Sequence, residues 1–201
     1  MNFKATDCFS IFGTRGTGKS YLARKLNDLY PRSVVIDPAR DWTDGEIVTS
    51  FTAFADKLKN KLNDKKFRII FQFNPDEANK EELLNHVLRL CFHFKNLQVV
   101  IDEVQLFTSP HYLPEYFKNL LFMGRHQGIS VMCITQRPAQ LNKSILSQSL
   151  HVYCGQLHDK NDISAVSSFL NTDSNKLFNL KKRQFIYFNP EIGTKLISTE
   201  K

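Results

Sequence analysis

Long apolar runs are absent from the sequence. No stretch approaches the roughly 18 consecutive apolar residues that a membrane-spanning helix needs. The segment Met1–Asp7 also lacks the basic, apolar and small-residue sections that make up a secretion signal. From these two absences we expect a protein without a membrane span that stays in the cytosol.

Cysteine is scarce and scattered. The four cysteines lack the close spacing that a zinc site needs, and three of them lie in apolar, strand-like runs. We expect small, buried side chains under the reducing conditions of a cytosol: Cys8, Cys91, Cys133 and Cys154.

Internal repeats, low-complexity tracts and linkers are also missing. The chain has 201 residues, of which 42% are hydrophobic and 23% charged. These values are ordinary for a soluble globular protein and leave room for one well-buried domain. We therefore expect a single domain over residues 1–201.

A modest excess of positive charge is present. Lysine and arginine number 27 against 20 aspartate and glutamate residues, which gives a net charge of +7. Basic residues concentrate between Asp56 and Arg68 and again at Lys181–Arg183. Each cluster is compatible with contact to nucleic acid, although charge runs more commonly form an ordinary solvated face.

Short apolar runs alternate with helical patterns along the whole chain. This alternation is typical of an α/β fold with a mainly parallel central sheet flanked by helices. The expected strands are residues 8–12, 34–37, 67–73, 98–102, 130–135, 151–155 and 184–188, with 194–198 as an edge strand.

Four segments between the strands have apolar residues at helical spacing. Asp76 is the expected N-cap of the third of these helices. The segments are 22–29, which Pro31 ends, then 51–62, 83–91 and, shorter, 114–124.

The stretch "GTRGTGKS" between the first strand and the first helix satisfies the phosphate-binding pattern G-x-x-x-x-G-K-[ST]. Its glycines let several backbone N–H groups point inward at a helix N-terminus, where phosphate binds. We expect Lys19 to reach the β- and γ-phosphates and the Ser20 hydroxyl to be a Mg²⁺ ligand. Arg15 either leans over the nucleotide or faces solvent. The expected nucleotide-binding residues are Gly13, Thr14, Arg15, Gly16, Thr17, Gly18, Lys19, Ser20 and Tyr21.

Two adjacent carboxylates end the apolar strand in "LQVVIDEVQ", residues 97–105. We expect Asp102 to hold Mg²⁺ through water and Glu103 to polarise the water that attacks the γ-phosphate. The alternative is an acidic pair that faces solvent, which the P-loop disfavours. Since the chain lacks a [N/T]-K-x-D guanine-selecting stretch, we expect ATP to be the nucleotide.

Gln136 follows the next strand along the chain, so it should emerge at the same carboxyl edge of the sheet. An amide at this edge can hydrogen-bond the γ-phosphate and the attacking water together. An ordinary loop glutamine is the alternative. With this assignment, Lys19, Glu103 and Gln136 are the expected catalytic residues within one subunit.

Six segments in this order resemble the HerA/FtsK superfamily of P-loop ATPases. The likeness is strongest to its small viral members, the genome-packaging ATPases of icosahedral viruses. It covers nearly the whole chain, and the later segments are more specific than the P-loop. The segments are "GTRGTGKS" (13–20), "VVIDP" (34–38), "VVIDE" (99–103), "GRHQG" (124–128), "TQRPAQLNKSILSQ" (135–148) and "LHDKNDI" (157–163).

The resemblance implies a RecA-like core that assembles into a ring, expected to be a hexamer, and pulls DNA by ATP hydrolysis. In such rings an arginine from the neighbouring subunit completes each site, and the family position falls on Arg125, with Arg137 as the second candidate. A guanidinium suits this role because it stays charged and donates forked hydrogen bonds. Asp37 matches an acidic family position that either supports the water or caps a turn.

The resemblance also implies partners. We expect sequence-independent contact with double-stranded DNA, for which Lys143 and the Lys181–Arg183 cluster are weak candidates. We also expect recruitment to a capsid vertex or portal, and a location in the host cytoplasm and at the virion vertex. Because the chain has no room for the extra domains of larger relatives, recruitment has to use this one domain.

Three other functions stay open from the sequence. Zot-like filamentous-phage assembly ATPases share the P-loop, the acidic strand and the "RH-x-G" region but usually carry a transmembrane segment. A small nucleotide kinase needs an acceptor pocket and an arginine-rich lid, and Glu103 beside its metal would be a liability. In a non-hydrolytic, nucleotide-gated binding module, Glu103 would be superfluous.

Overall fold

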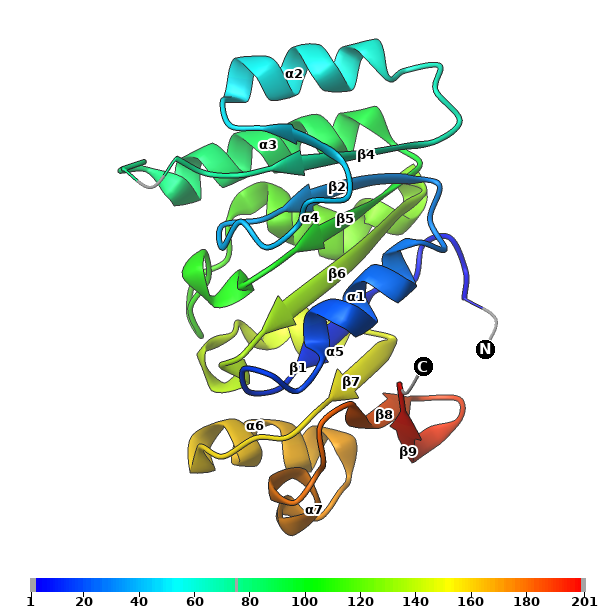
Figure 1. The fold of residues 1–201 in the computed structure, drawn as a ribbon, viewed down its shortest axis with the longest axis vertical. Helices are drawn as coiled ribbons and strands as arrows, with labels where there is room; N and C mark the ends of the chain where they lie inside the picture. Colours follow the sequence, from blue (N-terminus) through cyan, green and yellow to red (C-terminus); the bar gives the residue numbers. More distant parts are fainter. Residues whose placement is uncertain (1–2, 75, 200–201) are drawn as a thin grey trace.

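A single sheet runs through the molecule. The computed structural model describes residues 3–74 and 76–199 and places nine strands of these residues in the order β3-β4-β2-β5-β6-β1-β7-β8-β9 (Figure 1). Strands β1 to β7 pair in parallel, and β8 and β9 form an antiparallel hairpin at one edge. The strands are β1 (Phe9–Phe12), β2 (Arg32–Ile36), β3 (Glu46–Val48), β4 (Phe67–Phe71), β5 (Leu97–Ile101), β6 (Ile129–Thr135), β7 (His151–Cys154), β8 (Gln184–Asn189) and β9 (Gly193–Ser198).

Helices cover both faces of the sheet. Helix α1 lies in front of the sheet in Figure 1, and α3 and α4 lie behind it. The α-helices are α1 (Lys19–Asn27), α2 (Phe51–Asn60), α3 (Lys80–Phe94), α4 (Glu115–Met123), α5 (Lys143–Gln148), α6 (Lys160–Leu170) and α7 (Ser174–Phe178). Three short 3-10 helices are η1 (Val104–Leu106), η2 (Gly124–Gln127) and η3 (Pro138–Gln140).

The core consists of two apolar layers, one on each face of the sheet. Successive side chains of a strand point to opposite faces. In β5, accordingly, Val99 and Ile101 join the layer under α2 to α6, while Val100 joins the layer under α1. Both layers are fully buried at these positions, which explains why the parallel strands read as continuous apolar runs.

The predicted α/β class, the mainly parallel sheet and every predicted strand are confirmed, including the edge strand at 194–198. The prediction that Asp76 caps α3 is wrong, because α3 begins at Lys80 and its N-cap is Asn79. Two helices are also shorter than the sequence pattern predicts. Helices α1 and α2 end before Leu29 and Leu62, which are exposed.

All parallel strands point their carboxyl ends toward the same edge, on the left in Figure 1. The segments that follow β1, β5 and β6 therefore leave the sheet side by side, since these strands lie in the order β5-β6-β1. Ligands bind at this edge in open α/β sheets.

Candidate functional site: a phosphate-binding loop beside two strand ends

The loop between β1 and α1 has backbone angles that favour glycine. Gly18, the N-cap of α1, has φ of 101°, and Gly13 has φ of 148°. A Cβ atom on Gly13 would lie 2.8 Å from Oγ1 of Thr17, so a side chain there would displace the loop. The loop is also tied down from outside, because the backbone N–H of Thr14 donates to the carbonyl of Gln156 at 2.8 Å. Positive φ at these glycines is consistent with the loop backbone that the pattern predicts.

Lys19 lies inside the site rather than in solvent. It is 7% exposed, and its Nζ donates to the carbonyl of Thr14 at 3.0 Å. Burial lowers the pKa of the ammonium group, and the carboxylates of Glu103 and Asp102 oppose this shift. The lysine is therefore a buried cation that faces two acidic groups across the site.

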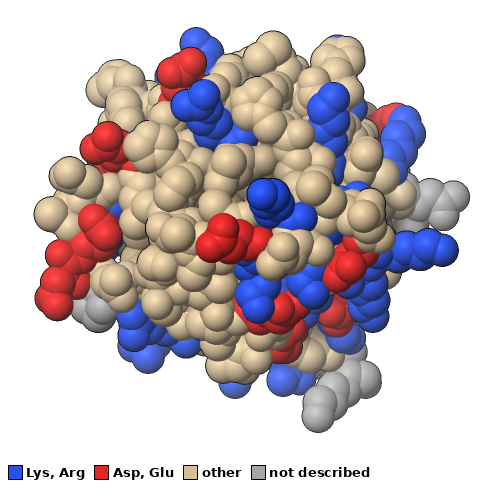
Figure 2. Space-filling model, turned by 90° about the horizontal axis from the view of Figure 1, so that it is seen from above, with Lys and Arg blue, Asp and Glu red and all other residues tan. Residues whose placement is uncertain are grey.

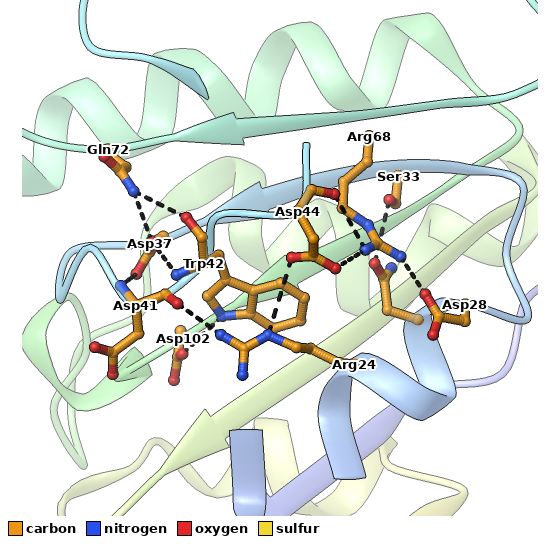
Figure 3. Close-up of polar contacts among 11 residues, drawn as sticks. Arg24, Asp28, Ser33, Asp37, Asp41, Trp42, Asp44, Arg68, Gln72 and Asp102 are labelled. Atoms are coloured by element: carbon orange, nitrogen blue, oxygen red, sulfur yellow. Dashed lines mark hydrogen bonds and ion pairs between the residues drawn. The ribbon is translucent and has the colours of Figure 1, made fainter. Parts of the chain in front are cut away.

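Asp102 follows β5 and is 4% exposed. Its Oδ2 accepts a hydrogen bond from Nε1 of Trp42 at 3.0 Å (Figure 3), and its Oδ1 accepts one from the backbone N–H of Glu103 at 2.9 Å. Burial raises the pKa of Asp102 to about 6, while both hydrogen bonds stabilise the charged form and lower it. A nearby cation would therefore favour ionisation of this carboxylate.

Glu103 is held by two glutamines in a backbone conformation that side chains rarely adopt, with φ of 45°. Its Oε2 accepts from Nε2 of Gln105 at 2.7 Å, and its Oε1 accepts from Nε2 of Gln136. Gln105 is itself held by the Thr135 hydroxyl at 2.6 Å. Left-handed backbone at a non-glycine residue costs about 1 to 3 kcal/mol and persists where the surroundings impose it.

One cavity of about 620 Å³ collects most of the predicted site residues. It lies where the loop meets the ends of β5 and β6, and Thr17, which is buried, supports the loop by donating to the Thr14 carbonyl at 2.9 Å. The residues that line the cavity are Arg15, Gly16, Gly18, Lys19, Ser20, Tyr21, Ala39, Asp41, Asp102, Glu103, Gln136 and Lys182.

The oxygen donors of the cavity fit Mg²⁺. The Ser20 hydroxyl and the Asp102 carboxylate line the same space, and Mg²⁺ takes oxygen ligands, usually a few from the protein and the rest from phosphates and water. Within residues 3–74 and 76–199 there is no group of three or more His, Cys, Asp and Glu side chains placed to hold a metal ion. A metal site completed by a bound phosphate is consistent with this composition.

Lys182 is a site residue that the sequence pattern did not predict. It precedes β8 and lines the cavity beside the phosphate-binding loop. Its neighbour Arg183 fixes this position, because its backbone N–H donates to the Thr17 carbonyl at 2.9 Å and its guanidinium lies 5.1 Å from the Tyr21 ring. The sequence alone predicts this cluster only as a candidate DNA contact. The contact with the loop arises from the β8–β9 hairpin, which local patterns do not reveal.

The two candidate trans-acting arginines differ in surroundings. Arg125 is exposed in η2, before the amino end of β6, whereas Gln136 follows its carboxyl end. At about 3.3 Å per residue, the length of β6 puts these ends about 20 Å apart. Arg137, in contrast, forms ion pairs within its own chain, at 3.5 Å to Asp159 and 3.3 Å to Asp162.

Asp37 caps a turn. It is fully buried, and its carboxylate accepts hydrogen bonds from the backbone N–H groups of Asp41 and Trp42 at 3.1 and 2.9 Å. Of the two roles left open for this residue, the turn cap is the one that its contacts support.

Three residues of the basic cluster between Asp56 and Arg68 form ion pairs with acidic neighbours. Lys57 and Lys61 each lie 2.8 Å from a carboxylate oxygen of Glu46, and Arg68 pairs with Asp28 at 2.8 Å and with Asp44. Figure 2, which views the molecule from the α2 end, shows lysine and arginine interspersed with aspartate and glutamate. At these three residues the positive charge is paired, which weakens them as candidates for contact with a polyanion.

In the part of the chain that the structure describes, no helix has both the length and the apolar character to cross a bilayer.

Comparison with known proteins places these observations in a family. The chain is 24% identical over 182 residues to Protein P9 of Pseudoalteromonas phage PM2, which covers 89% of this chain and 83% of that protein. The fold matches the DNA-packaging ATPase B204 of Sulfolobus turreted icosahedral virus with a TM-score of 0.73, at 19% identity over all of both chains. It matches VirB4 of Thermoanaerobacter pseudethanolicus with a TM-score of 0.76, at 13% identity, covering all of this chain and 92% of that one.

These structures are similar in fold to this chain, which agrees with the expected RecA-like P-loop core. The family of AAA domains matches residues 4–142, which contain the phosphate-binding loop, the acidic pair and Gln136. The chain therefore belongs to the AAA domain family of P-loop ATPases.

Proposed function

We propose that this protein is an ATP-hydrolysing DNA translocase that acts as a ring, expected to be hexameric, and packages a viral genome into a preformed capsid. One observation carries the hydrolytic part of the proposal. Lys19, Ser20, Asp102, Glu103 and Gln136, which come from three separate segments of the sequence, all line one cavity.

Each of these groups has a role in the proposed hydrolysis. The loop N–H groups and Lys19 bind the β- and γ-phosphates, and Ser20 and Asp102 hold Mg²⁺. The metal ion, when bound, neutralises charge that develops on the phosphate oxygens. Glu103 accepts the proton of the attacking water, and Gln136 orients this water and Glu103 together.

The hydrogen bond from Gln136 to Glu103 supports an enzyme over a passive binding module. In a module that only binds nucleotide, the strained backbone of Glu103 and its two glutamine partners would serve no purpose. The same arrangement disfavours a kinase, since it holds a base where water would attack.

The proposal of packaging draws on two further observations. B204, which is described as a DNA-packaging ATPase, has the same fold over its whole length. The six sequence segments that resemble viral packaging ATPases include "GRHQG", and its arginine, Arg125, is exposed. Because Arg125 lies at the far end of β6 from its own site, we propose that it reaches the site of a neighbouring subunit.

The proposed partners follow from the same resemblance to packaging ATPases. We propose that the ring binds double-stranded DNA through phosphate contacts, with exposed Lys143 and Lys181 as the remaining lysine candidates. We also propose docking on a capsid vertex or portal, and a location in the host cytoplasm and at the virion vertex.

The dependence of ATP turnover on DNA tests this proposal. Duplexes of several unrelated sequences should stimulate hydrolysis to the same extent, and added salt should remove the stimulation. A Lys19→Ala protein is the control for contaminating ATPases. Turnover indifferent to DNA, together with transfer of phosphate to a nucleotide acceptor, would instead establish a kinase.

A further inference from the structure

Trp42 is the one tryptophan of the sequence, and it contacts Asp102. It lies in the loop between β2 and β3 and is fully buried. A buried indole N–H needs an acceptor, and here the acceptor is Oδ2 of Asp102 at 3.0 Å. Figure 3 shows the ring edge directed at this carboxylate from the side of the loop.

The backbone around Trp42 is braced on the side of β4. The Asp37 carboxylate accepts the Trp42 N–H at 2.9 Å, and Nε2 of Gln72 donates both to Asp37 at 3.0 Å and to the Trp42 carbonyl at 3.2 Å (Figure 3). These bonds occupy both backbone polar groups of Trp42. The loop has no regular secondary structure at this point, so these side-chain hydrogen bonds fix the position of Trp42.

The other side of the indole ring is held by the helix that begins at the phosphate-binding loop. The guanidinium of Arg24, in α1, lies 4.9 Å from the centre of the Trp42 ring and donates to the Asp41 carbonyl at 2.6 Å. Asp41 itself lines the cavity. The ring thus lies between α1, which carries Lys19, and Asp102, which follows β5.

The Asp102 carboxylate is consequently fixed at both of its oxygens. Oδ2 accepts from Trp42 and Oδ1 from the Glu103 N–H at 2.9 Å, so rotation of the carboxylate would break a hydrogen bond. Removal of a group that orients a metal-binding carboxylate typically lowers the metal affinity by about 10 to 100-fold.

We propose that Trp42 is a positioning residue: its indole N–H orients the Asp102 carboxylate for Mg²⁺ and reports occupancy of the site by its fluorescence. This inference rests on the proposed function only in taking Asp102 as the carboxylate on the metal side. A core tryptophan with a merely structural role would affect stability and leave the Mg²⁺ dependence of nucleotide binding unchanged.

Because the chain has one tryptophan, a single chemical change can test the donor. Biosynthetic incorporation of a tryptophan analogue with sulfur in place of the indole N–H alters position 42 alone and keeps the ring shape. Calorimetry then measures binding of a non-hydrolysable ATP analogue at increasing Mg²⁺ concentration. Trp42→Phe serves as a second variant, and Tyr187→Phe, which loses a buried hydrogen bond to His151, is the matched control.

We expect the Mg²⁺ concentration that gives half of the maximal increase in nucleotide affinity to rise about tenfold in the sulfur analogue. The affinity for nucleotide without Mg²⁺ should stay nearly unchanged. The control should behave as the unmodified protein does. In the unmodified protein, the emission of Trp42 should change when Mg²⁺ joins the nucleotide complex.

Two outcomes overturn the inference. Nucleotide binding with the same Mg²⁺ dependence in analogue and unmodified protein overturns the role of Trp42 and leaves the proposed function standing. Failure of the unmodified, folded protein to bind nucleotide at all overturns both.

Discussion

Gln136 and Glu103 are joined by a hydrogen bond from the side-chain amide to the carboxylate. They follow the neighbouring strands β6 and β5, whose register pairs Ile101 with Cys133. The sheet thus brings together a candidate base and a candidate phosphate sensor from separate parts of the chain. A nucleotide phosphate that competes for the amide would change how Glu103 is held.

Glu103→Gln should abolish turnover and leave ATP binding intact, because the amide fills the same space but cannot accept a proton from water. We expect a fall in kcat of about 10² to 10⁴-fold. Steady-state hydrolysis and binding of a labelled ATP analogue measure the two effects. The exposed Glu191 offers a control, Glu191→Gln, that should behave like the unaltered protein. Unchanged turnover in Glu103→Gln would remove Glu103 from its role.

Gln136→Ala should lower kcat by about tenfold or more while KM for ATP changes little, since the amide acts on the water and the base. Gln140→Ala, at an exposed position of η3, is the matched control. Complete kinetic curves for both variants supply the comparison. A rise in KM at constant kcat would show instead that Gln136 only helps to bind the nucleotide.

Lys182→Ala should weaken nucleotide binding, because this lysine lines the cavity and attracts the phosphates. A loss of about 3 to 10-fold in affinity corresponds to one exposed charge contact. Lys181→Ala removes the same charge from the neighbouring residue, which is not among the cavity-lining residues. Equal nucleotide affinities in the two variants, with weaker DNA binding in both, would show that Lys182 contacts DNA and not the nucleotide.

Arg125→Ala subunits mixed with Lys19→Ala subunits should recover part of the ATPase activity that each lacks alone. In such a ring an intact phosphate-binding loop meets an intact Arg125 from its neighbour. Arg137→Ala is the control for this pairing, since its guanidinium is bound to Asp159 and Asp162 of its own chain. Absence of recovery in mixed, intact rings would contradict action across the interface.

The sequence predicted the parts of the site that depend on local pattern. Lys19 and Ser20 belong to one contiguous motif, and Asp102 ends an apolar strand that is easily recognised. Gln136 was predictable because parallel strands release their carboxyl ends at one edge. In these cases the position in the chain and one rule of topology together determine the position in space.

Other features depend on contacts that the local pattern does not encode. Lys182 reaches the cavity because the β8–β9 hairpin adds antiparallel strands beside β7, and Trp42 reaches Asp102 from an irregular loop. Helix α6 was not predicted, although the local sequence contains its signal: Asp159 caps it, and Ile163, Val166 and Leu170 share its buried face. Strand β3 has three residues, too few for a period of two to stand out.

Movement of DNA driven by ATP is the most direct test of the central claim. A duplex that carries a third strand bound in its major groove releases this strand when a motor travels along it. The unaltered protein should displace the third strand with ATP, fail with a non-hydrolysable analogue, and fail when Glu103 is replaced by glutamine. Full ATP hydrolysis in the presence of the duplex, with the third strand left in place, would contradict a translocase.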